Sequence, residues 1–160
     1  MIKNPTMIAN DAVFGSLAEC FITIDGRRYN FMSMTEFQSK WEVNVVDVPI
    51  LGKVGMGHKA AGGTGTWSGK AHYNQSVFRE MADHYQKTGE MPYFEIQVSN
   101  EDPTSVVGRQ TIIHHDCLCD TFSLAKFQSG NEILDEELSG TFESWDMPET
   151  FKHMNGFSTN

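Results

Sequence analysis

The chain has 160 residues, of which 39% are hydrophobic and 21% are charged. This composition predicts one folded domain and excludes a disordered protein, and no apolar run reaches the ~18 residues that a membrane-spanning helix needs. The formal net charge of −9 disfavours tight binding to nucleic-acid phosphates. Cys20, Cys117 and Cys119 are too few for a disulfide framework, so we expect reduced thiols.

Residues 1–12 are polar and contain Pro5, which predicts an arm outside the core. The start of the chain has no apolar segment of the kind a secretory signal needs. Residues 17–24 and 27–32 are rich in β-branched and aromatic residues and flank Asp25-Gly26. Because Asp-Gly tolerates positive φ at both turn positions, this pattern predicts a β-hairpin.

The next segment predicts a longer hairpin. Apolar and polar residues alternate over residues 36–45 and again over 66–73, which is typical of strands with one buried and one solvated face. The polar positions of the two strands are Glu36, Gln38, Lys40, Glu42, Asn44, Thr66, Ser68, Lys70 and His72. The connecting residues 49–66 are rich in glycine, so we expect a loop that is mobile alone and ordered by a partner.

Residues 74–89 predict a helix that Asn74 caps and Gly89 ends. Further strands are predicted over 93–98, 110–118, 120–127 and 138–145. The residues after Trp145 either cover the edge of the core or form an arm that docks on a neighbouring molecule. Together the elements predict a mainly β domain with one flanking α-helix, arranged as a small sandwich or barrel.

Three patterns suggest chemistry, and we favour a structural reading of each. The Gly-Lys pair at 69–70 lacks the upstream glycine of a phosphate-binding loop and is followed by Ala71 instead of Ser or Thr. His115, Cys117 and Cys119 would share one face of a strand and could hold zinc, but the sequence offers no second ligand pair. Neither a nucleophile motif nor a pair of carboxylates placed for catalysis stands out. We therefore expect no enzymatic activity, no cofactor and no metal.

Four segments resemble a known family: the opening MIKNPTMI, the segment GKVGMGHKAAGGTGTWSGK, the helix NQSVFREMADHY and the ending LSGTFESWDMPETF. Together they resemble the phage tail tube proteins, in particular those of PBSX-type defective prophages, over essentially the whole chain. The resemblance implies hexameric rings of β-rich subunits that stack into a hollow tube inside a contractile sheath.

The resemblance also implies partners. They are further copies of the chain and the sheath, tape measure and baseplate proteins, with DNA only as passing cargo and no membrane. The implied location is the bacterial cytoplasm during assembly and the tail of a phage-like particle after release. The alternative reading is a small β-domain binding module with the glycine-rich loop as its recognition loop.

Two surfaces follow from the resemblance. The nine polar hairpin residues named above would face the lumen of the tube, and their two acids and two lysines would leave it near neutral. Residues 90–160 carry 13 acidic and 3 basic side chains, so they are a second source of lumen charge and its sign stays open.

The glycine-rich segment 49–66 would contact the next ring. The residues expected at that contact are Gly52, Lys53, Val54, Gly55, Met56, Gly57, His58 and Lys59. The N-terminal arm 1–12 and a C-terminal arm 146–160 would be further contact segments.

Overall fold

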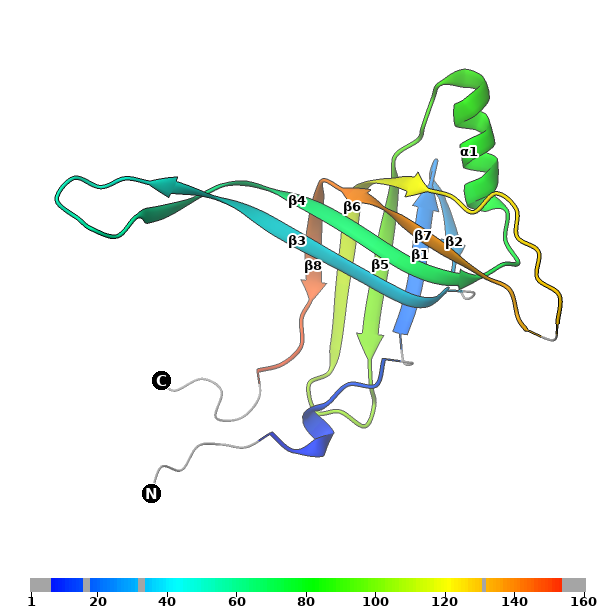
Figure 1. Ribbon diagram of the computed structural model, residues 1–160. Helices are drawn as coiled ribbons and strands as arrows, with labels where there is room; N and C mark the ends of the chain where they lie inside the picture. Colours follow the sequence, from blue (N-terminus) through cyan, green and yellow to red (C-terminus); the bar gives the residue numbers. More distant parts are fainter. Residues whose placement is uncertain (1–6, 16–17, 32–33, 131, 154–160) are drawn as a thin grey trace. The chain divides into compact units, whose positions relative to one another are not determined.

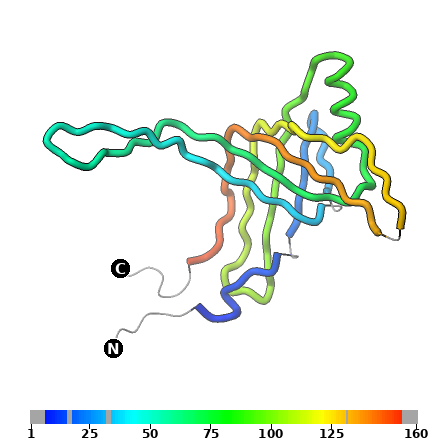
Figure 2. Tube along the Cα trace, viewed as in Figure 1, coloured from blue at the N-terminus to red at the C-terminus, as the bar shows by residue number. Residues whose placement is uncertain are grey.

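The computed structural model describes residues 7–15, 18–31, 34–130 and 132–153 (Figures 1 and 2). In that part, antiparallel strands dominate and one α-helix is present, which confirms the predicted fold class. The chain forms two compact units, and strand β6 (Arg109–Thr121) contributes residues up to His115 to the first and from Asp116 onward to the second. The expectation of a single domain stays a prediction.

The first unit contains β1 (Ala18–Ile24), β2 (Arg27–Asn30), β5 (Phe94–Glu101) and β8 (Ser144–Glu149). Its strand order is β2-β1-β5-β6, and β8 also pairs with β6. Asp25 and Gly26 have φ of 50° and 77°, so the predicted hairpin and its turn are confirmed. The core of this unit includes Ile22, Phe31, Phe94 and Ile96, which are all buried.

The N-terminal segment of the first unit is tied to the strands. Residues Ala9–Asp11 form a 3-10 helix, and the N–H of Val106 donates to the carbonyl of Asn10 at 3.1 Å. The predicted arm 1–12 is therefore partly anchored, and its residues 1–6 lie outside the described residues. The predicted C-terminal arm 146–160 begins inside β8, and its residues 154–160 also lie outside the described residues.

The second unit contains β3 (Met34–Val48), β4 (Gly57–His72), α1 (Val77–Thr88) and β7 (Asp135–Phe142), in the strand order β6-β7-β4-β3. The helix buries Phe78 and Met81 and ends at Gly89, whose φ is 77°. The predicted helix end is confirmed, but Ser76 and not Asn74 occupies the N-cap position.

The β3–β4 hairpin has two parts with different surroundings (Figure 1). We call residues 34–42 and 65–72 the hairpin base, because there β4 also pairs with β7. We call residues 43–64 the hairpin arm, where β3 and β4 pair with each other and the ribbon extends past the end of β7. A register shift between Val43 and Val45, opposite Gly62 at φ of 80°, marks where the arm begins.

Glycines in and beside the base allow side chains and neighbouring backbone to approach closely. A Cβ on Gly65 would lie 2.6 Å from the ring of Phe142, and a Cβ on Gly69 would lie 2.8 Å from the carbonyl oxygen of Glu36. On β7, a Cβ on Gly140 would collide with the carbonyl oxygen of Leu118. The glycines of this region are therefore required by close packing within strands.

Two sequence expectations are corrected here. The glycine-rich segment 49–66 is a loop only up to Met56, because β4 begins at Gly57 and the glycines beyond it pair with β3. The strand predicted over 120–127 is wrong, because β6 continues only to Thr121. Residues 144–149 form β8, which pairs with β6. The contact role expected of the C-terminal arm 146–160 stays a prediction.

Candidate assembly surfaces

The hairpin base presents one polar face to solvent. Strand register places Glu36 opposite Lys70, Gln38 opposite Ser68, and Lys40 opposite Thr66. Directly opposed residues point to the same face of an antiparallel pair. Glu42 continues this row on β3, whereas Asn44 lies at the register shift and His72 at the other end of β4. The structure thus brings the predicted polar residues of the base together on one face.

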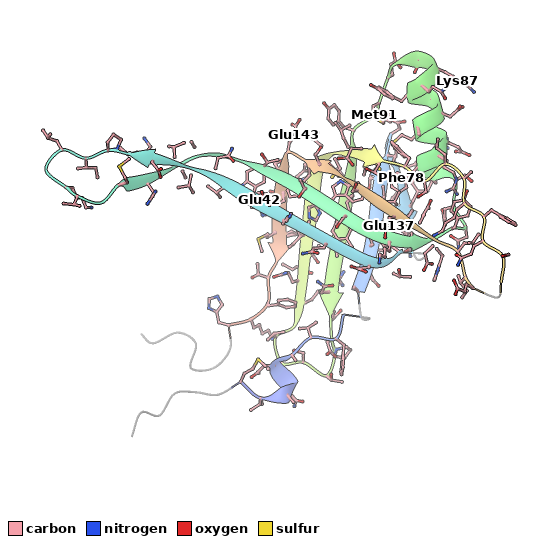
Figure 3. The ribbon with its side chains drawn as sticks, viewed as in Figure 1. Glu42, Phe78, Lys87, Met91, Glu137 and Glu143 are labelled. Carbon is pink, nitrogen blue, oxygen red and sulfur yellow. The ribbon has the colours of Figure 1, made fainter. Side chains whose placement is uncertain are left out.

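Strand β7 widens this face with residues that the sequence analysis missed. Glu137 lies opposite Lys70, Ser139 opposite Ser68, and Thr141 opposite Thr66. Figure 3 labels Glu137 on β7 and Glu42 on β3. The sequence analysis missed these residues because the sequence does not reveal that β7 pairs with β4. With Asp135 and Glu137 added, carboxylates outnumber lysines on the face.

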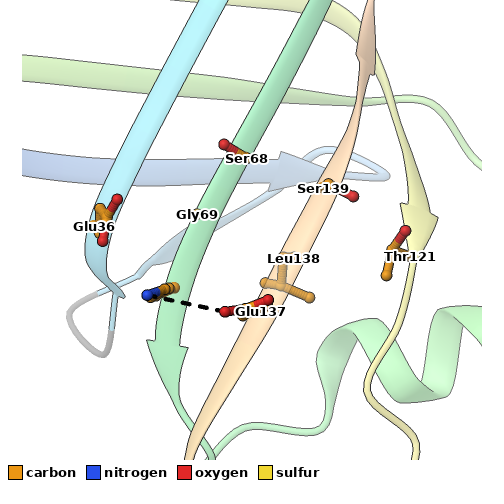
Figure 4. A pocket seen from close by; sticks show the side chains of 8 residues that line it. Glu36, Ser68, Gly69, Thr121, Glu137, Leu138 and Ser139 are labelled. Carbon is orange, nitrogen blue, oxygen red and sulfur yellow. Dashed lines mark ion pairs between the residues drawn. The ribbon is translucent and has the colours of Figure 1, made fainter.

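A shallow hollow of about 250 Å³ lies on this face (Figure 4). It is lined by side chains of β3, β4, β6 and β7, among them Glu36, Lys70 and Glu137. Lys70 Nζ lies 3.9 Å from Glu137 Oε1, and both side chains are exposed. An exposed pair of this kind adds little stability, so the face is a solvated surface with local charge pairing and is not a closed binding site.

The opposite face of the base is apolar. The rings of Phe37 and Trp67 stack with centroids 6.2 Å apart, and those of Trp41 and Phe142 lie 6.1 Å apart. Leu138 on β7 is buried beside them. The period-2 pattern of the sequence therefore separates a packed face from a wet face, as predicted.

The hairpin arm exposes its apolar residues. Leu51, Val54 and Met56 in the connection are exposed, and Val43 and Val45 are exposed on the ribbon itself. Of the residues predicted to contact the next ring, Gly52 to Met56 lie in the connection and Gly57, His58 and Lys59 open β4. His58 Nδ1 lies 2.9 Å from Asp47 Oδ1 across the ribbon.

The cluster on β6 does not form the metal site that its spacing allowed. Asp116 has a positive φ of 53°, which interrupts the alternation of side chains between His115 and Cys117. His115 contacts Asp146 at 2.7 Å and Glu95 at 3.1 Å, while Cys117 and Cys119 are buried. Among the described residues, no three His, Cys, Asp or Glu side chains are grouped so that they could hold a metal ion.

Burial also keeps the thiols protonated. It raises the pKa of Cys20 and that of Cys119 to about 12. A thiolate is the form that attacks a substrate or binds a metal. These two side chains therefore act as small apolar groups.

Two further polar clusters stabilise the units and were not foreseen from the sequence. In the second unit, Arg79 Nη1 donates to Glu136 Oε2 at 2.6 Å, and the Glu136 side chain is almost completely buried. In the first unit, Asp102 accepts hydrogen bonds from Thr104 and from the N–H of Phe14. The Thr104 hydroxyl is the largest of the causes that lower the pKa of Asp102.

Comparison with known proteins identifies the family. The model of the phage tail tube protein family matches residues 5–149. The chain belongs to this family. The phage-like element PBSX protein XkdM of Bacillus subtilis (strain 168) is 33% identical over 113 residues, which cover 71% of this chain and 77% of that protein. The resemblance stated from the sequence is thereby confirmed.

Solved structures show the same fold at low sequence identity. The structure of the anti-feeding prophage cap, described as a tube-terminating cap, gives a TM-score of 0.63 at 9% identity and covers 91% of this chain and 96% of that chain. The sheath-tube complex of an extracellular contractile injection system gives 0.59 at 9% identity, covering 87% and 93%. The α-helix of the described residues is too short and too polar to cross a membrane. As a member of a family of structural tail proteins, the chain is a component of a phage-like tail.

Proposed function

We propose that this tail tube protein is the subunit of a contractile-tail tube, in which six copies form a ring and rings stack around a central channel. The observation that carries the proposal is the hairpin base, a wide antiparallel surface with one packed face and one solvated polar face. Its last strand in the described order, β3, is 15 residues long and is paired on one side by β4. Pairing of its other edge with a neighbouring copy would extend the sheet into a closed barrel and leave no exposed edge.

The polar face of the base would line the channel. It carries the predicted lumen residues on β3 and β4 except Asn44, and β7 adds Asp135 and Glu137. The resulting acidic surplus would repel the phosphates of passing DNA, so DNA would be cargo that is not gripped. This charge would come from the pairing of β7 with β4, which adds two carboxylates to the near-neutral polar face of the hairpin alone.

The arm would make the contact between rings. Leu51 and Val54 of its connection are fully exposed among the described residues, and exposed apolar patches of this kind mark interaction sites. A contact between two different surfaces of one chain repeats without closing and therefore builds a filament. The sheath, tape measure and baseplate proteins are the remaining partners, and the proposed role is structural, without catalysis or cofactor.

Electron microscopy of the purified protein at increasing concentration tests the proposal. We expect hollow tubes with six-fold rings, seeded where necessary by short tube fragments. Rings of another symmetry, or a monomer that seeds do not recruit, would overturn it.

A cysteine-protection experiment tests the lumen assignment. Ser68→Cys lies on the polar face, and Gln86→Cys lies exposed on α1 as its matched control. A maleimide coupled to a polymer wider than duplex DNA should modify both thiols in the subunit but only Gln86→Cys in tubes, because the polymer cannot enter the channel. Equal labelling of both positions in tubes would contradict the lumen assignment.

A further inference from the structure

Strand β8 is attached to the first unit by backbone pairing and by charged side chains. All six of its residues are exposed, so none of them contributes a buried apolar side chain. Two of its carboxylates, those of Asp146 and Glu149, contact side chains of β6. A strand that buries little apolar surface opens more readily than a core strand. The attachment of β8 therefore depends strongly on these two contacts.

His115 on β6 holds one end of β8. Its Nε2 lies 2.7 Å from Asp146 Oδ2, and its Nδ1 lies 3.1 Å from Glu95 Oε1 on β5. A neutral imidazole carries one N–H, whereas the protonated ring donates from both nitrogens. Only protonated His115 can therefore satisfy both carboxylates, because loss of either proton turns a nitrogen lone pair toward a carboxylate oxygen.

The groups around His115 favour its protonated form. Among the described residues, the titratable groups that interact with it are Glu95 on β5, Asp146 on β8 and His114 beside it on β6. The hydrogen bond to Asp146 is the largest of the causes that raise the pKa of His115, ahead of the bond to Glu95. Desolvation lowers the pKa of His114, so this ring stays neutral above pH 6.5 and adds no opposing charge there.

The other contact of β8 involves a permanent charge. Glu149 Oε2 accepts a hydrogen bond from the Thr111 hydroxyl at 2.9 Å and lies 3.2 Å from Nε of Arg109. A guanidinium stays charged throughout the range in which histidine titrates. This end of β8 therefore stays anchored when His115 loses its proton.

The anchored end of β8 continues into a groove that three segments build together. The N–H of Lys152 donates to the carbonyl of Val107 at 2.7 Å. The N–H of Val106 donates to the carbonyl of Asn10 at 3.1 Å. These bonds join the C-terminal segment, the loop before β6 and the N-terminal segment around an apolar groove of about 400 Å³. The groove lies beyond the permanent anchor, so it should keep its form when the other end of β8 opens.

We propose that His115 is a protonation-dependent clip for β8: the protonated ring holds residues 145–147 against β6, and its loss of a proton lets them open while Glu149 and the groove stay in place. The contribution of the clip is complete below pH 6.5 and is lost as pH rises through the raised pKa of His115. Opening uncovers backbone groups of β6 to which a further strand could be added. This property of the subunit does not rest on its proposed place in a tube.

Hydrogen–deuterium exchange of the purified chain at pH 6.5 and pH 9, corrected for the intrinsic pH dependence of exchange, tests the clip. The protection of the paired amides in residues 145–147 should fall by about three-fold, the size expected for a partly exposed charged contact. At both pH values these amides should be less protected than the core of β5, because β8 opens without the rest of the unit. Constant protection of residues 145–147, or protection equal to that of β5, would overturn the proposal.

Two histidine variants identify the titrating group. His115→Gln removes the titrating ring, and His84→Gln removes an exposed ring on α1 as the matched control. The pH dependence of residues 145–147 should disappear in His115→Gln and persist in His84→Gln. The proposal fails if the dependence persists in His115→Gln, or if Lys152 N–H loses as much protection as residues 145–147.

NMR of the histidine ring nitrogens gives a second readout that does not depend on the opening of β8. Below pH 6.5 both ring nitrogens of His115 should carry a proton, and the signals are identified by their absence from His115→Gln. Asp146→Asn and Glu95→Gln should each lower the pH at which the ring loses its proton, and Asp146→Asn should lower it more. A neutral ring below pH 6.5, or a midpoint that neither variant lowers, would overturn the clip.

Discussion

The base and the arm of the β3–β4 hairpin are built from similar residues and meet different surroundings. In the base, Gly65 lies against the ring of Phe142 and Gly69 against the backbone of Glu36. In the arm, Gly55 and Gly62 have open space around the position of a Cβ, whereas Gly63 lies against the ring of Trp41. Strand β7 pairs with the base and stops where the arm begins. Glycines are therefore closely packed in both parts, but only in the base does a third strand lie beside them.

The apolar residues of the base and of the arm differ in burial. Leu138 of β7 is buried against the base, whereas Leu51 at the tip of the arm is completely exposed. Burying an aliphatic side chain contributes about 2 kcal/mol. The base has already gained this free energy within the subunit, and the arm can gain it only by assembly.

The largest expected effect comes from filling the closest approach near the base. In Gly140→Ala the new Cβ would meet the carbonyl oxygen of Leu118, which belongs to the backbone and cannot rotate away. We expect the free energy of unfolding to fall by at least about 4 kcal/mol, or the subunit not to fold. Gly55→Ala in the arm should change it by less than about 0.5 kcal/mol. Urea unfolding of both variants checks this, and similar losses would remove the contrast between base and arm.

The same truncation at two leucines separates stability from assembly. Leu138→Ala leaves a cavity and should lower the free energy of unfolding by about 3 kcal/mol. Leu51→Ala should leave it within about 0.5 kcal/mol but impair tube formation. Denaturant unfolding and electron microscopy of each variant provide the two readouts. Normal tubes from Leu51→Ala would show that the Leu51 side chain contributes no binding energy to the contact between rings.

Charged pairs sharpen the contrast further. Glu136→Gln leaves Arg79 with a neutral partner in a buried site, and we expect a loss of about 2 kcal/mol. Asp47→Asn breaks the exposed pair with His58 on the arm and should cost less than about 1 kcal/mol. Thermal unfolding monitored by circular dichroism measures both, and an equal loss would mean that the arm is buried in the isolated subunit.

The smallest expected effect lies outside the hairpin and depends on pH. The hydrogen bond to Asp146, followed by that to Glu95, raises the pKa of His115 above 6.5. The contribution of His115 is therefore complete below pH 6.5 and is lost as pH rises through the raised value. Desolvation lowers the pKa of the neighbouring His114. The contribution of His114 to the free energy of unfolding is therefore lost as pH falls below 6.5. Of these two histidines, only His115 changes stability above pH 6.5.

Asp146→Asn provides the control for this dependence. The variant should show a flatter decline of unfolding free energy between pH 6.5 and 9 than the native chain. An unchanged decline would mean that another group dominates the titration. The effect should be modest because Asp146 is largely exposed.

Local patterns predicted much of the fold because their physical causes are local. Asp25-Gly26 adopts positive φ and Gly89 ends the helix in the left-handed conformation, as each residue type favours. The alternation of polar and apolar residues placed the two faces of the hairpin base correctly. The family resemblance was also confirmed, because the family model matches residues 5–149.

Errors occurred where a distant partner decided the outcome. Glycines of residues 57–65 have low strand propensity, and pairing with β3 holds them in β4 nonetheless. The spacing of His115, Cys117 and Cys119 suggested one shared face, and the positive φ of Asp116 interrupts it. The spacing of residues reveals neither which strand pairs with another nor where the backbone interrupts the alternation of side chains between the two faces.

The sequence by itself determined the hairpins, the helix end, the polar and apolar faces and the family, because turn chemistry and side-chain period act over a few residues. Tertiary structure alone decided that β7 adds carboxylates to the polar face and that Gly140 lies against Leu118. It also decided that residues near positions 10, 107 and 152 meet in one groove. These features depend on strand order and on contacts between distant segments, which many sequences with the same local pattern could arrange differently.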